Sequence, residues 1–270
     1  MKRIIIITAC TLLFALVAIY LVHIIPETVQ SRMPGQQYIV SLGDSVAAGV
    51  GLGADSNRCG QTGTAYPILL GQQLHEQALQ FACSGATVGQ SDNTLITQYQ
   101  LATPYLRDSN VVMYAGANDV GWLDAIVNCT QSKCDTTQNR SAFARKLANM
   151  KHDLTNLLGQ IQQAKPSRVL VNTYYQLIAN NTSCLSKLGI TPQDSTFIND
   201  EETLLNSVIT AAANDSKATT VNINFNGHLL CDPQPWIQGV TANAPLHPTT
   251  AGQQQIANQD AKAIVTTTSY

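Results

Sequence analysis

The chain has 270 residues, of which 44% are hydrophobic and 12% are charged, and 17 acidic against 15 basic residues give a net charge of -2. This composition excludes an intrinsically disordered chain, because the apolar content is ordinary for a globular protein and the net charge is small. It also excludes nucleic acid as the expected partner, because there is no excess of Lys and Arg to neutralise phosphates.

The N-terminal segment, residues 1–25, is predicted to be an uncleaved signal anchor. Lys2 and Arg3 precede an apolar run over residues 4–25, which as a helix is about 33 Å long and crosses a hydrocarbon core of about 30 Å. No small-x-small cleavage pattern follows it, although cleavage would leave a secreted protein. The basic residues before the run place the following chain outside the cytoplasm.

The remaining chain is expected to be a short polar stalk, residues 26–36, followed by one domain over residues 37–270. Strands are predicted at 38–42, 79–83, 110–115, 168–173 and 219–224, and helices at 66–80, 140–163, 197–214 and 250–265. The helix over 140–163 has the clearest apolar spacing of three and four residues. Strands that alternate with helices predict a parallel sheet covered on both faces, with ligands bound outside the carboxyl ends of its strands.

One of the seven cysteines, Cys10, lies in the predicted anchor, and the other six lie in the domain. An even number of cysteines in an exported domain predicts three disulfides, with free buried thiols as the alternative. Cys129 and Cys134 enclose a short polar loop and are the simplest pair to assign. No metal is expected, because no CxxC or HxxxH pair is present.

Polar or glycine-containing segments follow the first three predicted strands. They are Gly43-Asp44-Ser45, Cys83-Ser84-Gly85 and Gly116-Ala117-Asn118-Asp119. A serine at such a position can expose its hydroxyl near backbone N–H groups, a glycine lets a backbone N–H approach a substrate, and an asparagine offers an amide donor. Each segment taken alone is explained better by a helix cap or a turn than by a functional role.

A serine nucleophile needs a general base, and five histidines are available. His23 lies in the predicted anchor, and His75 and His152 lie in predicted helices. Of the remaining two, His228 and His247, the second directly precedes the final helix. A loop in that position can project an imidazole over the strand ends.

In this order, Gly43-Asp44-Ser45, Gly85, Gly116-x-Asn118-Asp119 and His247-Pro248 resemble the SGNH hydrolases, also called GDSL esterases or lipases. The resemblance covers about residues 38–265. It is strongest to the disulfide-containing branch of secreted lipases and esterases, through residues 83–87 and 227–236. It implies a flavodoxin-like three-layer α/β/α fold with a five-stranded parallel sheet. We expect a monomer that needs no cofactor or metal.

The resemblance also implies a role for each matching residue. Ser45 is the nucleophile and His247 the general base and later the general acid. The backbone N–H groups of Ser45 and Gly85 and the side-chain amide of Asn118 form the oxyanion hole. His228 has a packing or loop-fixing role. The disulfides implied are Cys59–Cys83, Cys129–Cys134 and Cys184–Cys231.

One position departs from the family pattern. The family has an acid three residues before the histidine, where this chain has Ala244. That acid normally orients the imidazole and stabilises the imidazolium. We expect the backbone carbonyl of Ala244 to replace it, which leaves a Ser–His dyad. The alternatives are a distant acid, Asp232, or a weak or inactive enzyme.

The predicted function is that of an extracytoplasmic serine esterase or lipase, which hydrolyses small-molecule or lipid esters through an acyl-enzyme. The alternative enzyme is a carbohydrate O-acetylesterase that acts on cell-wall or extracellular glycans. A third reading, supported only by Ala244, is a non-catalytic surface module that binds glycan or lipid.

Overall fold

Five strands form a parallel sheet in the described residues of the computed structural model. They are β1 (Tyr38–Gly43), β2 (Gln77–Gln80), β3 (Asn110–Tyr114), β4 (Arg168–Asn172) and β5 (Thr219–Val221). The strand order is β2-β1-β3-β4-β5, and every neighbouring pair is parallel. Every residue of β1 and β3 is buried, as expected for central strands covered on both faces. The flavodoxin-like order confirms the predicted fold class.

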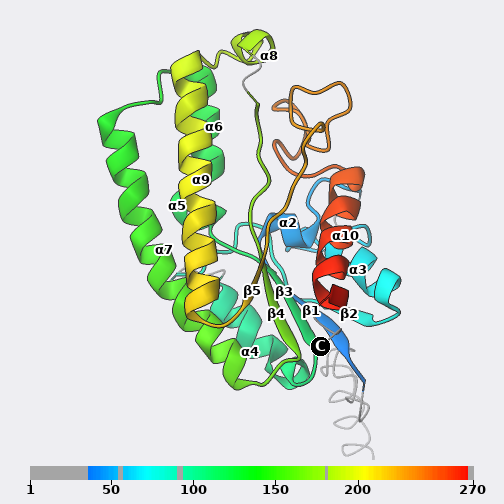
Figure 1. The fold of residues 1–270 in the computed structure, drawn as a ribbon. Coiled ribbons are helices and arrows are strands. Elements are labelled where there is room, and N and C mark those ends of the chain that lie inside the picture. Colours follow the sequence, from blue (N-terminus) through cyan, green and yellow to red (C-terminus); the bar gives the residue numbers. More distant parts are fainter. Residues whose placement is uncertain (1–35, 54–56, 90–93, 180–181, 267–270) are drawn as a thin grey trace, which may run out of the picture. The chain divides into compact units, whose positions relative to one another are not determined.

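Helices form a layer on each side of the sheet (Figure 1). One layer contains α3 (Tyr66–Leu74) and α10 (Thr250–Thr266), and the other contains α4 (Leu95–Leu106), α7 (Thr137–Gln163) and α9 (Pro192–Asp215). Four further helices of the described residues lie in the connections: α2 (Ser45–Ala48), α5 (Ala117–Val120), α6 (Trp122–Gln131) and α8 (Thr182–Lys187). The three-layer α/β/α arrangement brings the loops after β1, β3 and β4 to one edge of the sheet.

The structure describes residues 36–53, 57–89, 94–179 and 182–266. Within these ranges, none of the helices combines the length and the apolar character needed to cross a bilayer. The predicted anchor, residues 1–25, and almost all of the predicted stalk lie outside the described residues.

The helix predicted over residues 66–80 is wrong in its second half. Helix α3 ends at Leu74, because His75 adopts a left-handed conformation with φ 55° and the N–H of Glu76 closes the helix end by donating to the carbonyl of Gly71. Ala78, assigned by its spacing to the helix, lies in β2, which therefore begins two residues earlier than expected. Helices α4 and α6 were not predicted, and β5 is shorter than predicted.

The structure contains three disulfides, and they are the pairs that the family resemblance implied. Cys59–Cys83 fastens the chain after β2, Cys129–Cys134 closes the turn between α6 and α7, and Cys184–Cys231 joins α8 to the chain after β5. Each disulfide therefore supports connecting segments outside the sheet.

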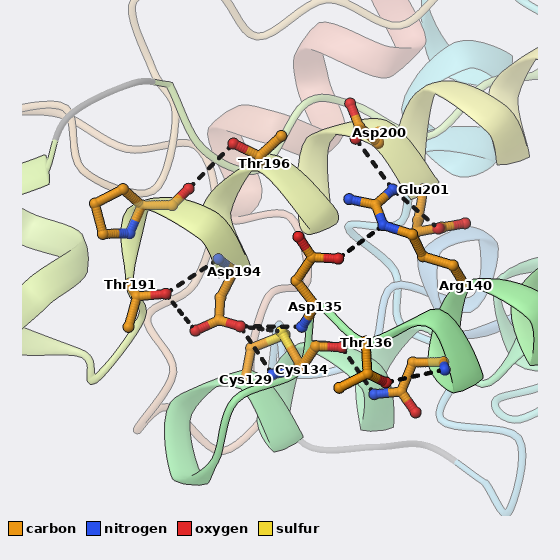
Figure 2. Close-up of polar contacts among 12 residues, drawn as sticks. Cys129, Cys134, Asp135, Thr136, Arg140, Thr191, Asp194, Thr196, Asp200 and Glu201 are labelled. Atoms are coloured by element: carbon orange, nitrogen blue, oxygen red, sulfur yellow. Dashed lines mark hydrogen bonds and ion pairs between the residues drawn. A yellow bond between two sulfur atoms is a disulfide. The ribbon is translucent and has the colours of Figure 1, made fainter.

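A buried carboxylate holds the corner where α6, α7 and α9 meet (Figure 2). Asp194 is only 1% exposed, and it accepts hydrogen bonds from the N–H groups of Cys134 at 2.8 Å and Asp135 at 3.1 Å and from the Thr191 hydroxyl at 2.6 Å. Arg140 on α7 pairs with Asp135 at 2.7 Å and with Asp200 of α9 at 3.1 Å. These contacts fix the C-terminal end of α6 against its neighbours.

Candidate active site

Ser45 lies where β1 turns into α2. Asp44 is the N-cap of α2, and its side chain accepts the N–H of Val46 at 2.9 Å. Gly43 has φ 139°, and a Cβ at this position would collide with the backbone carbonyl oxygen of Tyr114. The tight turn therefore requires glycine, and it places Ser45 as the first, partly exposed residue of the helix.

The structure brings His247 to this serine across 202 residues of chain: His247 Nε2 lies 2.7 Å from Ser45 Oγ. The other ring nitrogen, Nδ1, lies 2.9 Å from the backbone carbonyl oxygen of Pro245. A carbonyl can only accept a hydrogen bond, so the proton belongs on Nδ1. Nε2 is then free to accept the proton of the Ser45 hydroxyl.

The carbonyl that faces the imidazole is that of Pro245, so the prediction of Ala244 is wrong by one residue. The carbonyl of Ala244 instead accepts the backbone N–H of His247 at 3.3 Å. The cause is Leu246, whose φ of 63° reverses the chain and turns the preceding carbonyl toward the ring. Asp232, the other candidate, is engaged in its own turn, where it accepts the N–H of Leu229 at 2.7 Å.

The loop that carries His247 is fixed on two sides. The Tyr175 hydroxyl donates to the carbonyl of Leu246 at 2.8 Å. The N–H of Gln238 donates to the carbonyl of His247 at 2.8 Å, and the N–H of Leu246 donates to the carbonyl of Gln238 at 3.0 Å. These bonds compensate the left-handed conformation of Leu246 and keep the imidazole in place.

The two remaining predicted oxyanion donors lie on segments that are bonded to each other. Asn118 on α5 donates its side-chain amide to the carbonyl of Ala86 at 2.9 Å. The Asp119 carboxylate accepts the N–H groups of Val88 at 3.0 Å and Gly89 at 3.1 Å. Gly85, exposed and with φ 77°, therefore belongs to a loop that α5 holds from one side.

Ser45, Asn118 and His247 line one cleft with about 530 Å³ of space, part of which is open to solvent. The rest of the lining is mainly apolar and comes from α6, the chain after β4 and the His247 loop: Trp122, Leu123, Ile126, Tyr174, Tyr175, Leu177, Pro245 and Leu246. Such a lining can bind an apolar part of a ligand.

A buried carboxylate lies directly beside the serine. Asp44 is 1% exposed, and the Tyr174 hydroxyl donates to it at 2.5 Å. Burial raises the pKa of Asp44, although the bonds from Tyr174 and Val46 and the attraction of His247 oppose the shift. Tyr174 in turn accepts the N–H of Ala117 at 3.0 Å, so this network joins the serine turn to the start of α5.

The sequence analysis missed Tyr174 and Tyr175. They lie two and three residues after the end of β4, at the same sheet edge as Ser45, so the strand-end rule could have found them. His228 lies stacked on Trp236, with ring centroids 3.7 Å apart, in agreement with a packing role. Among the described residues there is no cluster of three side chains that could hold a metal ion.

A doubly wound α/β fold, with a serine and a histidine paired at the strand ends beside an apolar cleft, indicates a hydrolase. The model of the GDSL-like lipase/acylhydrolase family matches residues 41–255, and the chain belongs to this family. It is therefore a carboxylic ester hydrolase, as predicted from the ordered motifs.

Individual relatives agree with this assignment. A lipase from Streptomyces rimosus is 31% identical over 230 residues, which make up 80% of this chain and 82% of the relative. The crystal structure of a phospholipase A1 from Streptomyces albidoflavus NA297 has a TM-score of 0.72 at 27% identity and covers 85% of this chain and 99% of its own. That of the extracellular lipase from Streptomyces rimosus has a TM-score of 0.68 at 25% identity, with coverage of 84% and 99%.

Proposed function

We propose that this enzyme hydrolyses carboxylic esters through an acyl-enzyme on Ser45, with His247 as the general base and no carboxylate in a third position. The observation that carries this proposal is the 2.7 Å contact between His247 Nε2 and Ser45 Oγ, together with the Pro245 carbonyl on Nδ1. His247 takes the hydroxyl proton as Oγ attacks the ester carbonyl. The imidazolium then protonates the leaving alcohol, and water repeats the sequence on the acyl-enzyme.

The negative charge of the tetrahedral intermediate needs donors at the start of α2 and on the neighbouring loops. The N–H groups of Ser45 and Gly85 and the Asn118 amide are assigned this role. The Asn118 amide has two N–H donors. One donates to the carbonyl of Ala86, and the other would donate to the substrate. Removal of one such donor typically lowers kcat by about 10²–10³-fold.

The Pro245 carbonyl orients the imidazole but carries no full charge. It therefore stabilises the imidazolium less than the usual carboxylate would, and we expect a modest penalty in rate rather than loss of activity.

The substrate class that the cleft favours is a lipid or other ester with an extended acyl chain. Aliphatic and aromatic side chains of α6, of the chain after β4 and of the His247 loop make up most of the lining. The relatives named as lipase and phospholipase A1 support the same class. Hydrolysis of acetyl groups from glycans would not require such a lining. The preference for long acyl chains over acetate therefore distinguishes a lipase from a carbohydrate O-acetylesterase.

The site of action is proposed to be outside the cytoplasm. Three disulfides support an oxidising compartment, and the relative from Streptomyces rimosus is described as an extracellular lipase. The anchor over residues 1–25 stays a prediction from the sequence.

The test is the variant Ser45→Ala in the full-length chain, measured on p-nitrophenyl esters from acetate to decanoate. We expect a loss of at least about 10⁴-fold in kcat with an unchanged circular dichroism spectrum, because the nucleophile is removed and the fold is not. Wild type should prefer medium or long acyl chains and should be labelled at Ser45 by a fluorophosphonate. Full activity of the variant would remove Ser45 from the mechanism, and a strict preference for acetate would favour the O-acetylesterase.

A further inference from the structure

Two buried glutamine side chains hold the backbone on either side of Ser45. Gln98 of α4 and Gln253 of α10 are 4% and 0% exposed. They approach the serine turn from opposite faces of the sheet, because α4 and α10 belong to different layers (Figure 1). Neither belongs to the motifs that identified the family.

Gln98 makes a double hydrogen bond with Gly43, two residues before the serine. The side-chain oxygen of Gln98 accepts the N–H of Gly43 at 2.7 Å, and its amide nitrogen donates to the carbonyl of Gly43 at 2.9 Å. A carboxamide presents the same donor and acceptor as a peptide group. Gln98 therefore acts as a peptide surrogate beside the last residue of β1, beyond the point where the neighbouring strand β2 ends at Gln80.

The bond to Gly43 also concerns the oxyanion side of the site. The carbonyl of Gly43 accepts a further hydrogen bond from the N–H of Cys83 at 3.0 Å. Cys83 stands two residues before Gly85 and is fastened to Cys59 by a disulfide. One backbone carbonyl thus joins the Gln98 amide, the serine turn and the loop that carries Gly85.

Gln253 makes the corresponding connection on the other side of the serine. Its amide nitrogen donates to the carbonyl of Val46 at 2.9 Å, and its oxygen accepts the N–H of Tyr66 at 2.7 Å. Val46 directly follows Ser45. Gln253 lies in the first turn of α10, which starts at Thr250, three residues after His247. The same side chain therefore links α2 to the helix that follows the His247 loop.

We propose that Gln98 and Gln253 are positioning residues, the first holding Ser45 relative to Gly85 and the second holding it relative to His247. This inference rests on the proposed function of Ser45 and His247. Both side chains are uncharged amides, so they hold the backbone around Ser45 without adding a charge next to the imidazolium. Displacement of reacting groups by about 1 Å can cost about 10²-fold in rate, which sets the scale of the effect.

The experiment compares Gln98→Met and Gln253→Met with wild type on one p-nitrophenyl ester, at a temperature where every variant is folded. Methionine keeps the length of the side chain and removes both hydrogen bonds. We expect kcat to fall by about 10–100-fold while KM stays within about twofold, because positioning acts on the transition state. The Ki of a boronic acid analogue of the tetrahedral state should rise by the same factor as kcat falls.

The matched control is Gln259→Met on the same helix as Gln253. Like Gln98, Gln259 makes two hydrogen bonds with the backbone of one residue. It accepts the N–H of Asn224 at 3.0 Å and donates to the carbonyl of Asn224 at 3.4 Å, but Asn224 is not a residue of the site. Its kcat and Ki should equal those of wild type. A purely structural role of the other two glutamines would lower Tm and leave kcat and Ki at the control values.

A conservative variant keeps the test decisive if a methionine variant does not fold. In Gln98→Glu and Gln253→Glu the side chain accepts at any pH but donates only when protonated. The ratio of variant to wild-type kcat should therefore rise as the pH falls. Folded variants with kcat and Ki within about twofold of wild type at every pH would overturn the inference. The proposed function would stand in that case if Ser45→Ala is inactive, and it would fall if Ser45→Ala retains full activity.

Discussion

The orientation of a single imidazole ring determines what the Ser45–His247 pair can do. With Nδ1 facing the Pro245 carbonyl at 2.9 Å, the proton is kept on the side of the ring away from the serine. This arrangement supplies the orienting function that an acid has elsewhere in the family, and it leaves the charge-stabilising function unfilled. We therefore expect the missing carboxylate to lower the rate of hydrolysis without changing the orientation of the ring.

The prediction at the residue scale concerns Asp232. Asp232→Asn should change kcat by less than about threefold, because its side chain accepts the N–H of Leu229 and asparagine retains an oxygen for that bond. Steady-state kinetics on a p-nitrophenyl ester, with His247→Ala as the inactive reference, provides the measurement. A drop of several orders of magnitude would identify Asp232 as a third member of the catalytic set.

The residues of the site were predicted unequally, for a physical reason. Ser45 and Asn118 follow β1 and β3, whose carboxyl ends meet at one edge of the sheet, whereas His247 precedes the last helix. Their expected roles came from the resemblance to the family. The Pro245 carbonyl depends on the left-handed backbone of Leu246, for which the sequence contains no glycine as a signal. Gln98 and Gln253 reach backbone groups 55 and 207 residues away, and such contacts leave no pattern in the sequence.

At the scale of elements, the corner formed by α6, α7 and α9 (Figure 2) supports the cleft, because α6 supplies part of its lining. Burial opposes the ionisation of Asp194, but hydrogen bonds from Thr191, Cys134 and Asp135 outweigh it and lower the pKa of this carboxyl. A lowered pKa means that the stabilisation is present above the unfolded-state pKa and is lost as the pH falls through the folded-state value.

The prediction at this scale is that Asp194→Ala lowers the free energy of unfolding by about 3 kcal/mol at pH 7. It removes charge-assisted hydrogen bonds and leaves two backbone N–H groups without their acceptor. Urea unfolding monitored by circular dichroism provides the measurement. Asp194→Asn, which keeps one acceptor oxygen, should lose less. A change below about 0.5 kcal/mol for the alanine variant would show that the corner does not need this carboxylate.

The elements themselves were predicted where one apolar period dominates. The helix over 140–163 was found because seven apolar residues share its buried face. The end of α3 was missed because the helical spacing continues through Ala78, while the chain stops the helix by a left-handed histidine, a residue that is not a usual helix terminator. Helix α4 contains Pro104 and many polar residues, which hides its pattern.

At the scale of the whole molecule, two buried carboxyl groups on opposite faces of the sheet determine how stability depends on pH. Burial raises the pKa of Asp260 on α10 from 3.8 to about 7, and that of Glu202 on α9 from 4.5 to about 8. Hydrogen bonds from Asn172 and from the N–H of Leu177 oppose these shifts. Between the unfolded and folded values, the folded state retains protons that the unfolded state has released.

The resulting prediction is a loss of stability on the alkaline side. The contribution of these groups is fully present below pH 4 and disappears as the pH rises through about 7 and about 8. The free energy of unfolding of the wild type should therefore decline between pH 5 and pH 9. The double variant Asp260→Asn, Glu202→Gln should decline by about 1–3 kcal/mol less over that interval. Parallel curves for the two proteins would show that neither group is protonated in the fold.

Because Ser45 and His247 are 202 positions apart in the sequence, we expect esterase activity to require nearly the whole chain. The proposed nucleophile, Ser45, directly follows the first strand, whereas the proposed base, His247, lies in the segment before the last helix, which must be synthesised and bound to Gln238 and Tyr175. Chains that end before His247, whether incompletely synthesised or truncated, consequently contain Ser45 without its proposed base. Recovery of turnover during refolding should therefore coincide with docking of this last segment. Before that step, we expect the enzyme to be inactive.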